Sequence, residues 1–380
     1  MKKRYIITAI IVVLILGLLF WFRFLGLEKP THPAPVQPIA EKSFVDKTLD
    51  NMSLRDKVAS LFILHTPGTD KTKLAQFVNK YKPGGIILMG DNIPATTTQL
   101  ADMTKALTGD KKLPILIATD EEGDTVRRLD SDNFYGALEL RNLPARSTKD
   151  AFTNRSLLLK SVGINLNFGI VADVTDNPSS FIYPRVLGTN PTEASARVAA
   201  AVDGTKGITL STIKHFPGHG ETEANSHLTI PVATTTYGDW LERVSPPFEA
   251  GIKAGADVVM FGQLTYSSVD PLPATLSKKW HDILTNNLGF KGIMITDDMV
   301  MLQNSGDPNY SDTVENSVEA INAGNNLILF VTDHDDAKSM INPDNLIDGV
   351  VNAVKDGQIK QTLIDASARK VLNLRFNLPG

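Results

Sequence analysis

The segment KGIMITDDM (residues 291–299) holds a short, continuous run of apolar residues that ends in two adjacent acids, Asp297 and Asp298. Strands of a parallel sheet have this composition because helices cover both faces of the sheet, so the apolar residues do not alternate with polar ones. The segment therefore predicts a buried parallel strand that carries ionisable side chains at its carboxyl end.

Seven more apolar runs of this kind occur along the chain, each bounded by turn residues and separated from the next by a helix-like segment. Together the eight runs lie at 60–64, 84–90, 113–119, 163–174, 207–216, 256–264, 291–298 and 325–333. Eight buried parallel strands with intervening helices predict an α/β fold, a (β/α)8 TIM-like barrel. An open, doubly wound sheet is the alternative that this pattern allows.

A barrel of this type places its chemistry where the strands end. The apolar runs end in TDEEGD, ADVTDN, KHFPGHG, TDDM and VTDHDD, all rich in polar and ionisable residues, as a barrel requires. Before the first run, Ser53 is followed three residues later by Asp56, a pattern that resembles a capping box and predicts the start of a helix.

The N-terminus predicts a membrane anchor. After MKKR come eighteen uncharged residues, 5–22, which as a helix would span roughly 27 Å, close to the ~30 Å hydrocarbon core of a bilayer. The run ends in bulky aromatic residues where a cleavable signal peptide needs small ones, so a cleaved signal is the alternative. Three cations before the run, against Arg23 after it, keep the N-terminus in the cytoplasm.

The predicted organisation is an anchor at 1–27, a proline-rich linker at 28–43 and one catalytic barrel at 44–380. Prolines at 30, 33, 35 and 38 favour an extended spacer that holds the barrel away from the membrane. We therefore expect a single-pass protein of the cell membrane whose barrel lies outside the cytoplasm. A net charge of −4 gives no basic surface for nucleic acid, and the absence of cysteine excludes disulfides and thiol nucleophiles.

The segment KHFPGHGETEANSHLTIP (residues 214–231) contains three histidines, His215, His219 and His227. Metal binding is one interpretation, but a Pro-Gly turn separates the first two histidines and no H-E-x-x-H motif is present. We expect no metal and no cofactor. His227 lies in a hydrophilic stretch and is the better candidate for proton transfer, because imidazole titrates near neutral pH.

Two other strand ends carry candidate site residues. Asp297 and Asp298 are adjacent on an extended strand, so only one of them can face the barrel mouth, as a nucleophile or as an acceptor for backbone groups. In TDEEGDTVRR, Asp120 is suited to accept hydrogen bonds from sugar hydroxyls, and Arg128 is placed to return to the mouth. A solvated loop with internal ion pairs is the alternative for this second segment.

These segments resemble glycoside hydrolase family 3. The resemblance rests on KHFPGHGETEANSH, TDEEGDTVRR, KGIMITDDM and INLNFGIVADV followed by RVLG, in the family's order over roughly residues 49–378. Within the family, these segments resemble the single-barrel β-N-acetylhexosaminidase branch. The resemblance implies a barrel with one catalytic domain and a covalent, metal-independent mechanism.

The resemblance also implies a role for individual residues. Asp297 matches the nucleophile that forms a glycosyl-enzyme, and His227 matches the acid/base of a mobile loop. His219 and Asp298 resemble positions that support that loop and the strand end. The residues that match those holding an N-acetylglucosamine unit are Asp120, Arg128, Arg185, Lys214 and His215.

Asn225 departs from the family pattern, which has aspartate two residues before the catalytic histidine. The usual aspartate accepts a hydrogen bond from the imidazole and stabilises its charged form, whereas the amide of Asn225 can accept but supplies no charge. We therefore include Asn225 with His227 and Asp297 as the third catalytic residue. Asp124 and Thr125 replace a glycine and an arginine of the family pattern, at the floor of the sugar site.

The expected activity is that of a retaining exo-β-N-acetylglucosaminidase that acts outside the membrane on cell-wall muropeptides or related amino-sugar glycans. Two alternatives stay open. One is other chemistry on the same fold, by a β-glucosidase or a phosphorylase that transfers the sugar to phosphate. The other is a glycan-binding protein whose catalysis is impaired because Asn225 supplies no charge.

Overall fold

The computed structural model describes residue 21 and residues 43–108, 112–332 and 341–379. The chain divides into two units, 1–42 and 43–380, and the second unit contains the barrel. The predicted anchor and linker lie, apart from residues 21 and 43, outside the described residues. Within the described part of the chain, no helix is both long and apolar enough to cross a membrane.

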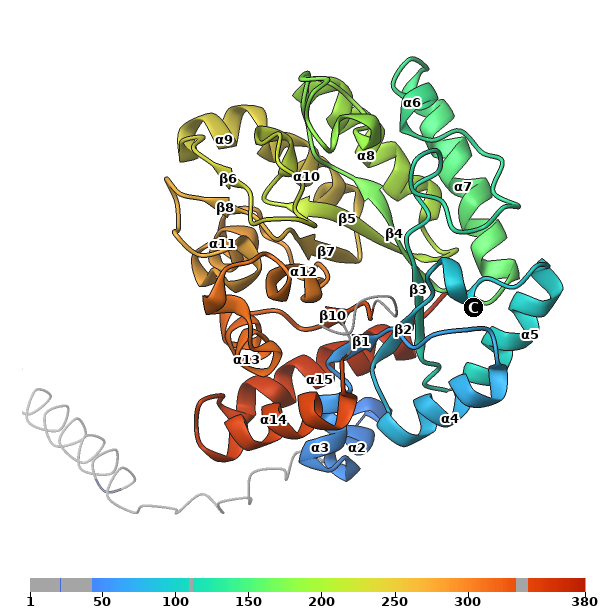
Figure 1. The fold of residues 1–380 in the computed structure, drawn as a ribbon, viewed down its shortest axis with the longest axis vertical. Helices are drawn as coiled ribbons and strands as arrows, with labels where there is room; N and C mark the ends of the chain where they lie inside the picture. Colours follow the sequence, from blue (N-terminus) through green and yellow to red (C-terminus); the bar gives the residue numbers. More distant parts are fainter. Residues whose placement is uncertain (1–20, 22–42, 109–111, 333–340, 380) are drawn as a thin grey trace, which may run out of the picture. The chain divides into compact units, whose positions relative to one another are not determined.

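The predicted barrel is confirmed as a nearly closed sheet of eight parallel strands, one from each apolar run (Figure 1). Each strand pairs with its neighbours in chain order, and β1 also pairs with β10. A single parallel bridge between Ile295 and Leu327 joins the two remaining edges. The strands are β1 (Phe62–Leu64), β2 (Gly85–Ile87), β3 (Leu116–Thr119), β4 (Leu166–Val171), β5 (Leu210–Phe216), β7 (Val258–Phe261), β9 (Ile293–Thr296) and β10 (Ile328–Phe330).

Helices surround the strands, as the burial of both sheet faces requires (Figure 1). The predicted helix start at Ser53 is confirmed, because the Ser53 hydroxyl accepts from the Asp56 backbone N–H at 3.1 Å. The α-helices are α2 (Phe44–Asn51), α3 (Leu54–Ala59), α4 (Lys71–Tyr81), α5 (Thr97–Leu107), α6 (Ala137–Leu140), α7 (Ala145–Ser161), α8 (Pro191–Thr205), α9 (Tyr237–Arg243), α10 (Ser245–Ala254), α11 (Lys278–Asp282), α12 (Val300–Gln303), α13 (Thr313–Ala323), α14 (Pro343–Lys355) and α15 (Gln361–Phe376).

A small second sheet lies outside the barrel and is not predicted from the sequence. It consists of two parallel strands, β6 (Val232–Ala233) and β8 (Thr265–Tyr266). Strands of two residues are too short to produce a hydrophobic pattern. This sheet joins the end of residues 217–231, here called the histidine loop, to the segment that follows β7.

The beginning of the histidine loop is fixed by an aromatic cluster around Phe216, the last residue of β5. The Phe216 ring meets four buried rings edge-on, at centroid distances of 5.9 Å to Trp240, 5.4 Å to Phe248, 5.2 Å to Phe261 and 5.7 Å to Trp280. Aromatic pairs with this geometry stabilise the fold by more than the burial of their apolar area alone would.

The first two residues of the loop are held through their carbonyl oxygens. The Trp240 indole donates to Pro217 at 2.8 Å, and the Tyr266 hydroxyl donates to Gly218 at 2.7 Å. Gly218 has a φ of 135°, a conformation that side chains rarely adopt, and a Cβ there would collide with Val244. The loop therefore leaves the barrel in one fixed direction.

Replacing Phe216 by alanine should destabilise the protein by about 3–5 kcal/mol, because the change removes a ring from a fully buried cluster and leaves a cavity. Urea denaturation of the two proteins measures this difference. Leu157→Ala is the control, because Leu157 is 50% exposed and its loss should cost no more than about 0.5 kcal/mol. A loss below about 1 kcal/mol for Phe216→Ala would contradict the role of the cluster.

Candidate active site

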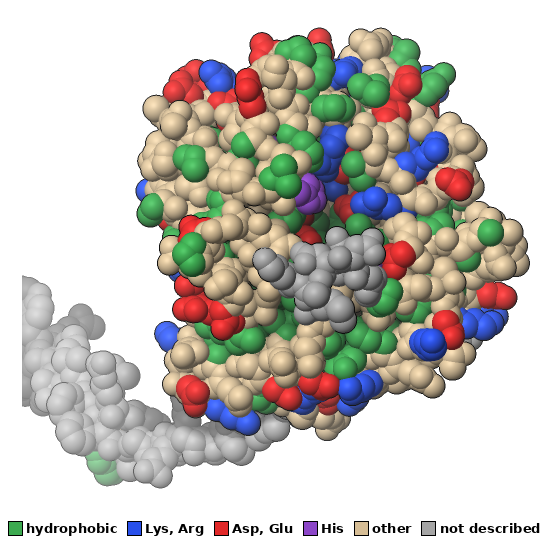
Figure 2. Space-filling model, in the orientation of Figure 1, with side chains coloured by type: hydrophobic (Ala, Val, Ile, Leu, Met, Phe, Trp, Pro, Cys, Tyr) green, Lys and Arg blue, Asp and Glu red, His purple; other side chains and the backbone are tan. Residues whose placement is uncertain are grey.

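A cavity of about 750 Å³ opens at the carboxyl ends of the strands. Figure 2 shows it as a hollow with acidic, basic and histidine side chains in its walls. The carboxyl ends of parallel strands meet on one side of a barrel, which is why residues far apart in sequence converge here. Seven of the eight predicted site residues line the cavity: Asp120, Arg128, Arg185, Lys214, His215, His227 and Asp297.

Asp297, the predicted nucleophile, lines the cavity directly after β9. Its backbone N–H donates to the Phe261 carbonyl at 2.8 Å and so extends the pairing between β9 and β7. One carboxylate oxygen accepts from the Asp298 backbone N–H at 2.8 Å. No other described residue donates to the carboxylate, so the second oxygen is available to a molecule in the cavity.

Asp298 ties the end of β9 to the end of β10. One of its oxygens accepts from the backbone N–H of Val300 at 3.0 Å and of Val331 at 2.9 Å. Burial raises the pKa of Asp298 to about 8, and the nearby Asp297 acts in the same direction. At neutral pH, Asp298 therefore keeps its proton and adds no negative charge beside Asp297.

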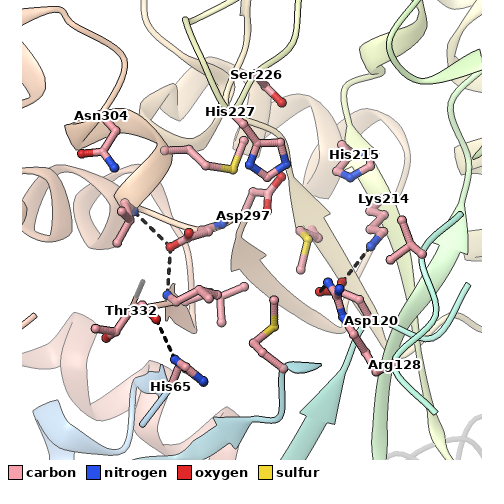
Figure 3. A pocket seen from close by; sticks show the side chains of 18 of the residues that line it. His65, Asp120, Arg128, Lys214, His215, Ser226, His227, Asp297, Asn304 and Thr332 are labelled. Atoms are coloured by element: carbon pink, nitrogen blue, oxygen red, sulfur yellow. Dashed lines mark hydrogen bonds and ion pairs between the residues drawn. The ribbon is translucent and has the colours of Figure 1, made fainter. Parts of the chain in front are cut away.

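An ion-pair cluster forms one wall of the cavity. The Lys214 ammonium lies 2.9 Å from an oxygen of Asp120 and 2.7 Å from an oxygen of Glu122. Arg185 binds Glu122 with two hydrogen bonds, at 2.9 and 2.7 Å. Figure 3 shows Lys214, Asp120 and Arg128 together on one side of the cavity. Lys214 lies in β5, Arg185 ends the 3-10 helix η2 (Tyr183–Arg185), and the other groups lie in the segment that follows β3.

The charges of this cluster keep its carboxylates ionised. Burial alone would raise the pKa of Asp120, but Lys214 and Arg128 outweigh it and lower that pKa to about 2. The pKa of Glu122 is lowered in the same way, chiefly by Arg185 against the effect of burial. Ionised carboxylates only accept hydrogen bonds, so this wall is suited to hydroxyl donors.

His215 is held as a neutral imidazole in one tautomer. Its Nε2 lies 3.2 Å from a nitrogen of Arg185, which can only donate, and its Nδ1 lies 2.7 Å from Asp173. The ring proton therefore sits on Nδ1 and is donated to Asp173. Burial, together with the positive charge of Arg185, lowers the pKa of His215 well below its ordinary value.

Glu122 and Asp173, which hold Arg185, Lys214 and His215 in place, are not predicted from the sequence. Glu122 lies two residues after Asp120, a spacing that turns both side chains to the same side of an extended segment. Asp173 follows β4 and accepts from the backbone N–H of His215, at 3.3 Å, and of His219, at 2.6 Å. The acidic ends TDEEGD and ADVTDN were the signals that could have identified them.

The opposite side of the cavity was also not predicted. There, His65 lies with one ring nitrogen 3.1 Å from Asp91 and the other 2.9 Å from the Thr332 carbonyl. Met89 and Met301 also line the cavity. Figure 3 shows His65 and Thr332 across the cavity from the ion-pair cluster, with Asp297 and His227 between the two sides. The cavity therefore has the ion-pair cluster on one side and His65 with its hydrogen-bond partners on the other.

His227 extends from the histidine loop over the cavity, on the side where Asp297 lies (Figure 3). Its imidazole meets the edge of the Phe181 ring at a centroid distance of 6.0 Å and an angle of 72°. The residue is exposed to solvent. A group in this position can reach both the contents of the cavity and bulk water.

Asn225 does not line the cavity. Its amide oxygen accepts from the backbone N–H of His227 at 2.9 Å, so it fixes the turn that precedes the imidazole instead of contacting the ring. The two acids of the same loop also face elsewhere. Glu221 pairs with Arg243 at 2.8 Å, and Glu223 accepts from Asn177 at 2.7 Å. No carboxylate of the loop therefore assists His227.

The three histidines do not form a metal site in the described part of the structure, where no group of three or more His, Cys, Asp or Glu has a suitable arrangement. Both ring nitrogens of His215 are already engaged by Asp173 and Arg185. The arrangement can instead hold a polyol against the charged wall and expose it to one carboxylate and one imidazole.

Known proteins are similar to this chain in sequence and in fold. The model of the glycosyl hydrolase family 3 N terminal domain matches residues 53–374. A curated Beta-hexosaminidase from Nitrosomonas eutropha is 30% identical over 270 residues, which cover 68% of this chain and 76% of that protein.

Two solved structures extend the similarity to three dimensions. A glycoside hydrolase family 3 beta-N-acetylglucosaminidase from Paenibacillus sp. str. FPU-7 matches with a TM-score of 0.77 and 27% identity, over 86% of this chain and 63% of that chain. A Beta-N-acetylhexosaminidase from Beutenbergia cavernae matches with a TM-score of 0.73 and 27% identity, over 86% of this chain and 99% of that one. The chain thus spans less than two thirds of the first protein and nearly all of the second.

The raised pKa of Asp298 predicts how stability depends on pH. The folded-state pKa of about 8 exceeds the ordinary value of 3.8, so the contribution to the free energy of unfolding is complete below about pH 4 and is lost progressively as the pH rises to about 8. In Asp298→Asn the amide oxygen can still accept the two backbone N–H groups but cannot ionise. Urea denaturation should therefore show a flatter pH dependence for Asp298→Asn than for the wild type, and equal slopes would contradict the assignment.

Proposed function

Because this chain belongs to glycosyl hydrolase family 3 and is therefore a glycoside hydrolase, we propose that it is a retaining exo-β-N-acetylglucosaminidase. Its relatives are named Beta-hexosaminidase and beta-N-acetylglucosaminidase. The observation that carries the proposal is the position of Asp297 and His227 in one cavity, next to a wall of ionised carboxylates and paired cations. A terminal β-linked N-acetylglucosamine unit is the substrate.

The first step transfers the sugar to the enzyme. Asp297 attacks the anomeric carbon and forms a carbon–oxygen bond, while the bond from that carbon to the leaving oxygen breaks. The imidazolium of His227 gives its proton to the leaving oxygen, which departs as an alcohol. The free oxygen of Asp297 and the position of His227 above the cavity support these two roles.

The second step releases the sugar. Neutral His227 takes a proton from water, the water oxygen bonds to the anomeric carbon, and the bond to Asp297 breaks. The exposure of His227 supports this step, because the same imidazole must meet both the leaving group and incoming water. Two inversions at one carbon retain the β configuration.

The charged wall holds the sugar unit during both steps. Asp120 accepts hydrogen bonds from hydroxyl groups, and Lys214, Arg128 and Arg185 donate to them. Because the ammonium and guanidinium groups are already fixed by carboxylates, little side-chain entropy is lost when the sugar binds. The protonated state of Asp298 and the use of an imidazole as acid keep further negative charge away from Asp297.

Hydrolysis is favoured over transfer to phosphate by the pairing of the cations. Lys214 binds Asp120 and Glu122, Arg185 binds Glu122, and Arg128 lies 3.4 Å from Asp120. Among the described residues of the cavity, every lysine and arginine thus already faces a carboxylate. A phosphate ion would meet those carboxylates without an unpaired cation to offset the repulsion.

One observation favours the second candidate, a glycan-binding protein with impaired catalysis. Asn225 contacts the backbone of His227 and supplies no charge to the imidazolium. General acid catalysis typically increases the rate by a factor of about 10²–10⁴, so a partial loss of this catalysis leaves a slow enzyme that still binds sugar. We place the hydrolase first because Asp297 and His227 are both present in the cavity.

The proposed setting is the outer side of the cell membrane. The apolar segment 5–22 between MKKR and Arg23 would anchor the chain, and the proline-rich linker would hold the barrel near the cell wall. Muropeptides of the wall, or related amino-sugar glycans, are the natural substrates in this proposal. Separating a tagged protein between the membrane and soluble fractions of growing cells tests the proposed anchor.

Removing the nucleophile should abolish turnover. We expect the wild-type protein to release p-nitrophenol from p-nitrophenyl β-N-acetylglucosaminide. In Asp297→Ala, kcat should fall by a factor of at least about 10³. Asp282→Asn, a change at a half-exposed residue of α11 that does not line the cavity, should keep full activity. Formation of sugar 1-phosphate on addition of phosphate would contradict hydrolysis. Binding of N-acetylglucosamine without turnover over days would favour the binding protein.

Asn225→Asp should raise kcat by about tenfold or more, within the typical range for a general acid. The new carboxylate can accept from the same backbone N–H and adds a negative charge that favours the imidazolium of His227. Asn225→Ala, which removes the acceptor and the turn together, should lower kcat below the wild-type value. If Asn225→Asp left kcat unchanged, the neutral residue could not be the cause of impaired catalysis.

A further inference from the structure

His219 has an unusual environment for a buried histidine. It is 2% exposed, begins the 3-10 helix η3 (His219–Glu221) and lines the cavity. Neither of its ring nitrogens has a hydrogen-bond partner among the described residues. Buried polar atoms of this kind are rare because leaving them unsatisfied is costly, so each calls for a physical reason.

The ring of His219 is held in place by its neighbours without being hydrogen-bonded by them. Its centroid lies 5.8 Å from that of Phe181 and 6.0 Å from that of His215. Its backbone N–H donates to Asp173 at 2.6 Å. Residue 220 is glycine, and a Cβ there would collide with the carbonyl oxygen of Val174, so the backbone packs directly against the segment that follows β4.

These contacts place the imidazole between the two parts of the site. His215 belongs to the charged wall through Arg185 and Asp173, whereas Phe181 also contacts the ring of His227 at 6.0 Å. A group bound between the charged wall and the proton donor would therefore lie next to His219. That is the region in which a sugar ring would have to sit to reach Asp297.

The ionisation of His219 limits what it can bind. Burial lowers its pKa below the ordinary value, and the positive charge of Arg185 acts in the same direction although Asp173 opposes both. The ring is therefore neutral at neutral pH, with one N–H donor and one acceptor nitrogen. A hydroxyl group, which both donates and accepts, matches this pair better than an anion or a cation does.

We propose that His219 is a further substrate-binding residue, which hydrogen-bonds a hydroxyl group of the bound sugar between His215 and His227. The inference rests on the proposed glycosidase function and adds a residue to its sugar site. It departs from the supporting role that the family resemblance implies, since a residue that only supports the loop would have its ring nitrogens bound to protein groups. An ordered water as the sole partner is the competing outcome.

The chain offers a matched control in His281. This histidine is also 2% exposed, and its ring stacks on that of Phe261 at a centroid distance of 3.8 Å. One of its ring nitrogens lies 2.8 Å from the Ser277 carbonyl, and the residue is absent from the cavity lining. A change at His281 therefore reports the cost of altering a buried imidazole without touching the sugar site.

The experiment compares His219→Phe, His219→Asn and His281→Asn in the complete chain. For each protein we would measure urea stability, the dissociation constants of N-acetylglucosamine and glucose by calorimetry, and kcat/KM on the two p-nitrophenyl β-glycosides. We expect His219→Phe to weaken sugar binding about tenfold, the size of one hydrogen bond, and to lower kcat/KM at least as much. His219→Asn retains a donor and an acceptor and should recover part of the loss.

The outcomes separate this inference from the proposed function. His281→Asn should lose stability but keep sugar binding within about twofold. If His219→Phe remains folded and binds sugar as the wild type does, His219 is structural or binds only water, and the inference is wrong. If the wild type binds glucose but not N-acetylglucosamine, the proposed substrate fails, yet His219→Phe still tests the contact on glucose. If it binds neither sugar, both proposals fall.

Discussion

The buried ammonium of Lys214 is the constraint on which the rest of the site depends. A charge removed from water must be paired and hydrogen-bonded, because an unpaired buried charge costs several kcal/mol. Lys214 in β5 is satisfied only if Asp120 and Glu122, which follow β3, lie beside it, and Glu122 in turn fixes Arg185. The pairing therefore brings separate strand ends to one wall and leaves that wall with ionised acceptors. Burial alone would lower the pKa of Lys214, but these carboxylates raise it above its ordinary value.

The same wall sets the ionisation of the histidines around it. Arg185 forces His215 to accept at Nε2, so His215 stays neutral, and His219 stays neutral because it is buried. Of the three histidines in residues 214–231, only His227 is exposed to water. Burial therefore separates the histidines: the imidazoles of His215 and His219 are buried and neutral, and the imidazole of His227 is in contact with water. Asn225 shapes the turn before that imidazole through its bond to the His227 backbone and supplies no charge to the ring.

Much of this structure could be predicted because it follows from local composition. Continuous apolar runs identified all eight barrel strands, and the polar strand ends identified the cavity. The two-residue strands β6 and β8 leave no periodic signal, so the sheet that closes the histidine loop could not be found. Glu122 and Asp173 could have been predicted, because Glu122 lies two residues after the predicted site residue Asp120 and Asp173 lies two residues after the end of β4. The hydrogen-bond partner of Asn225 could not be predicted, because the sequence does not decide whether the amide faces the backbone or the ring of His227. The predicted anchor stays a prediction.

The measurement that tests the account most directly is the trapping of a covalent intermediate. A fluorinated N-acetylglucosaminide with a good leaving group slows the second step more than the first, so a glycosyl-enzyme should accumulate. Mass spectrometry of the digested protein should then find the sugar on the peptide that contains Asp297, and none on the Asp297→Ala protein. Steady turnover of the same compound with no adduct at Asp297, or an adduct on another residue, would contradict the central claim that this carboxylate is the nucleophile.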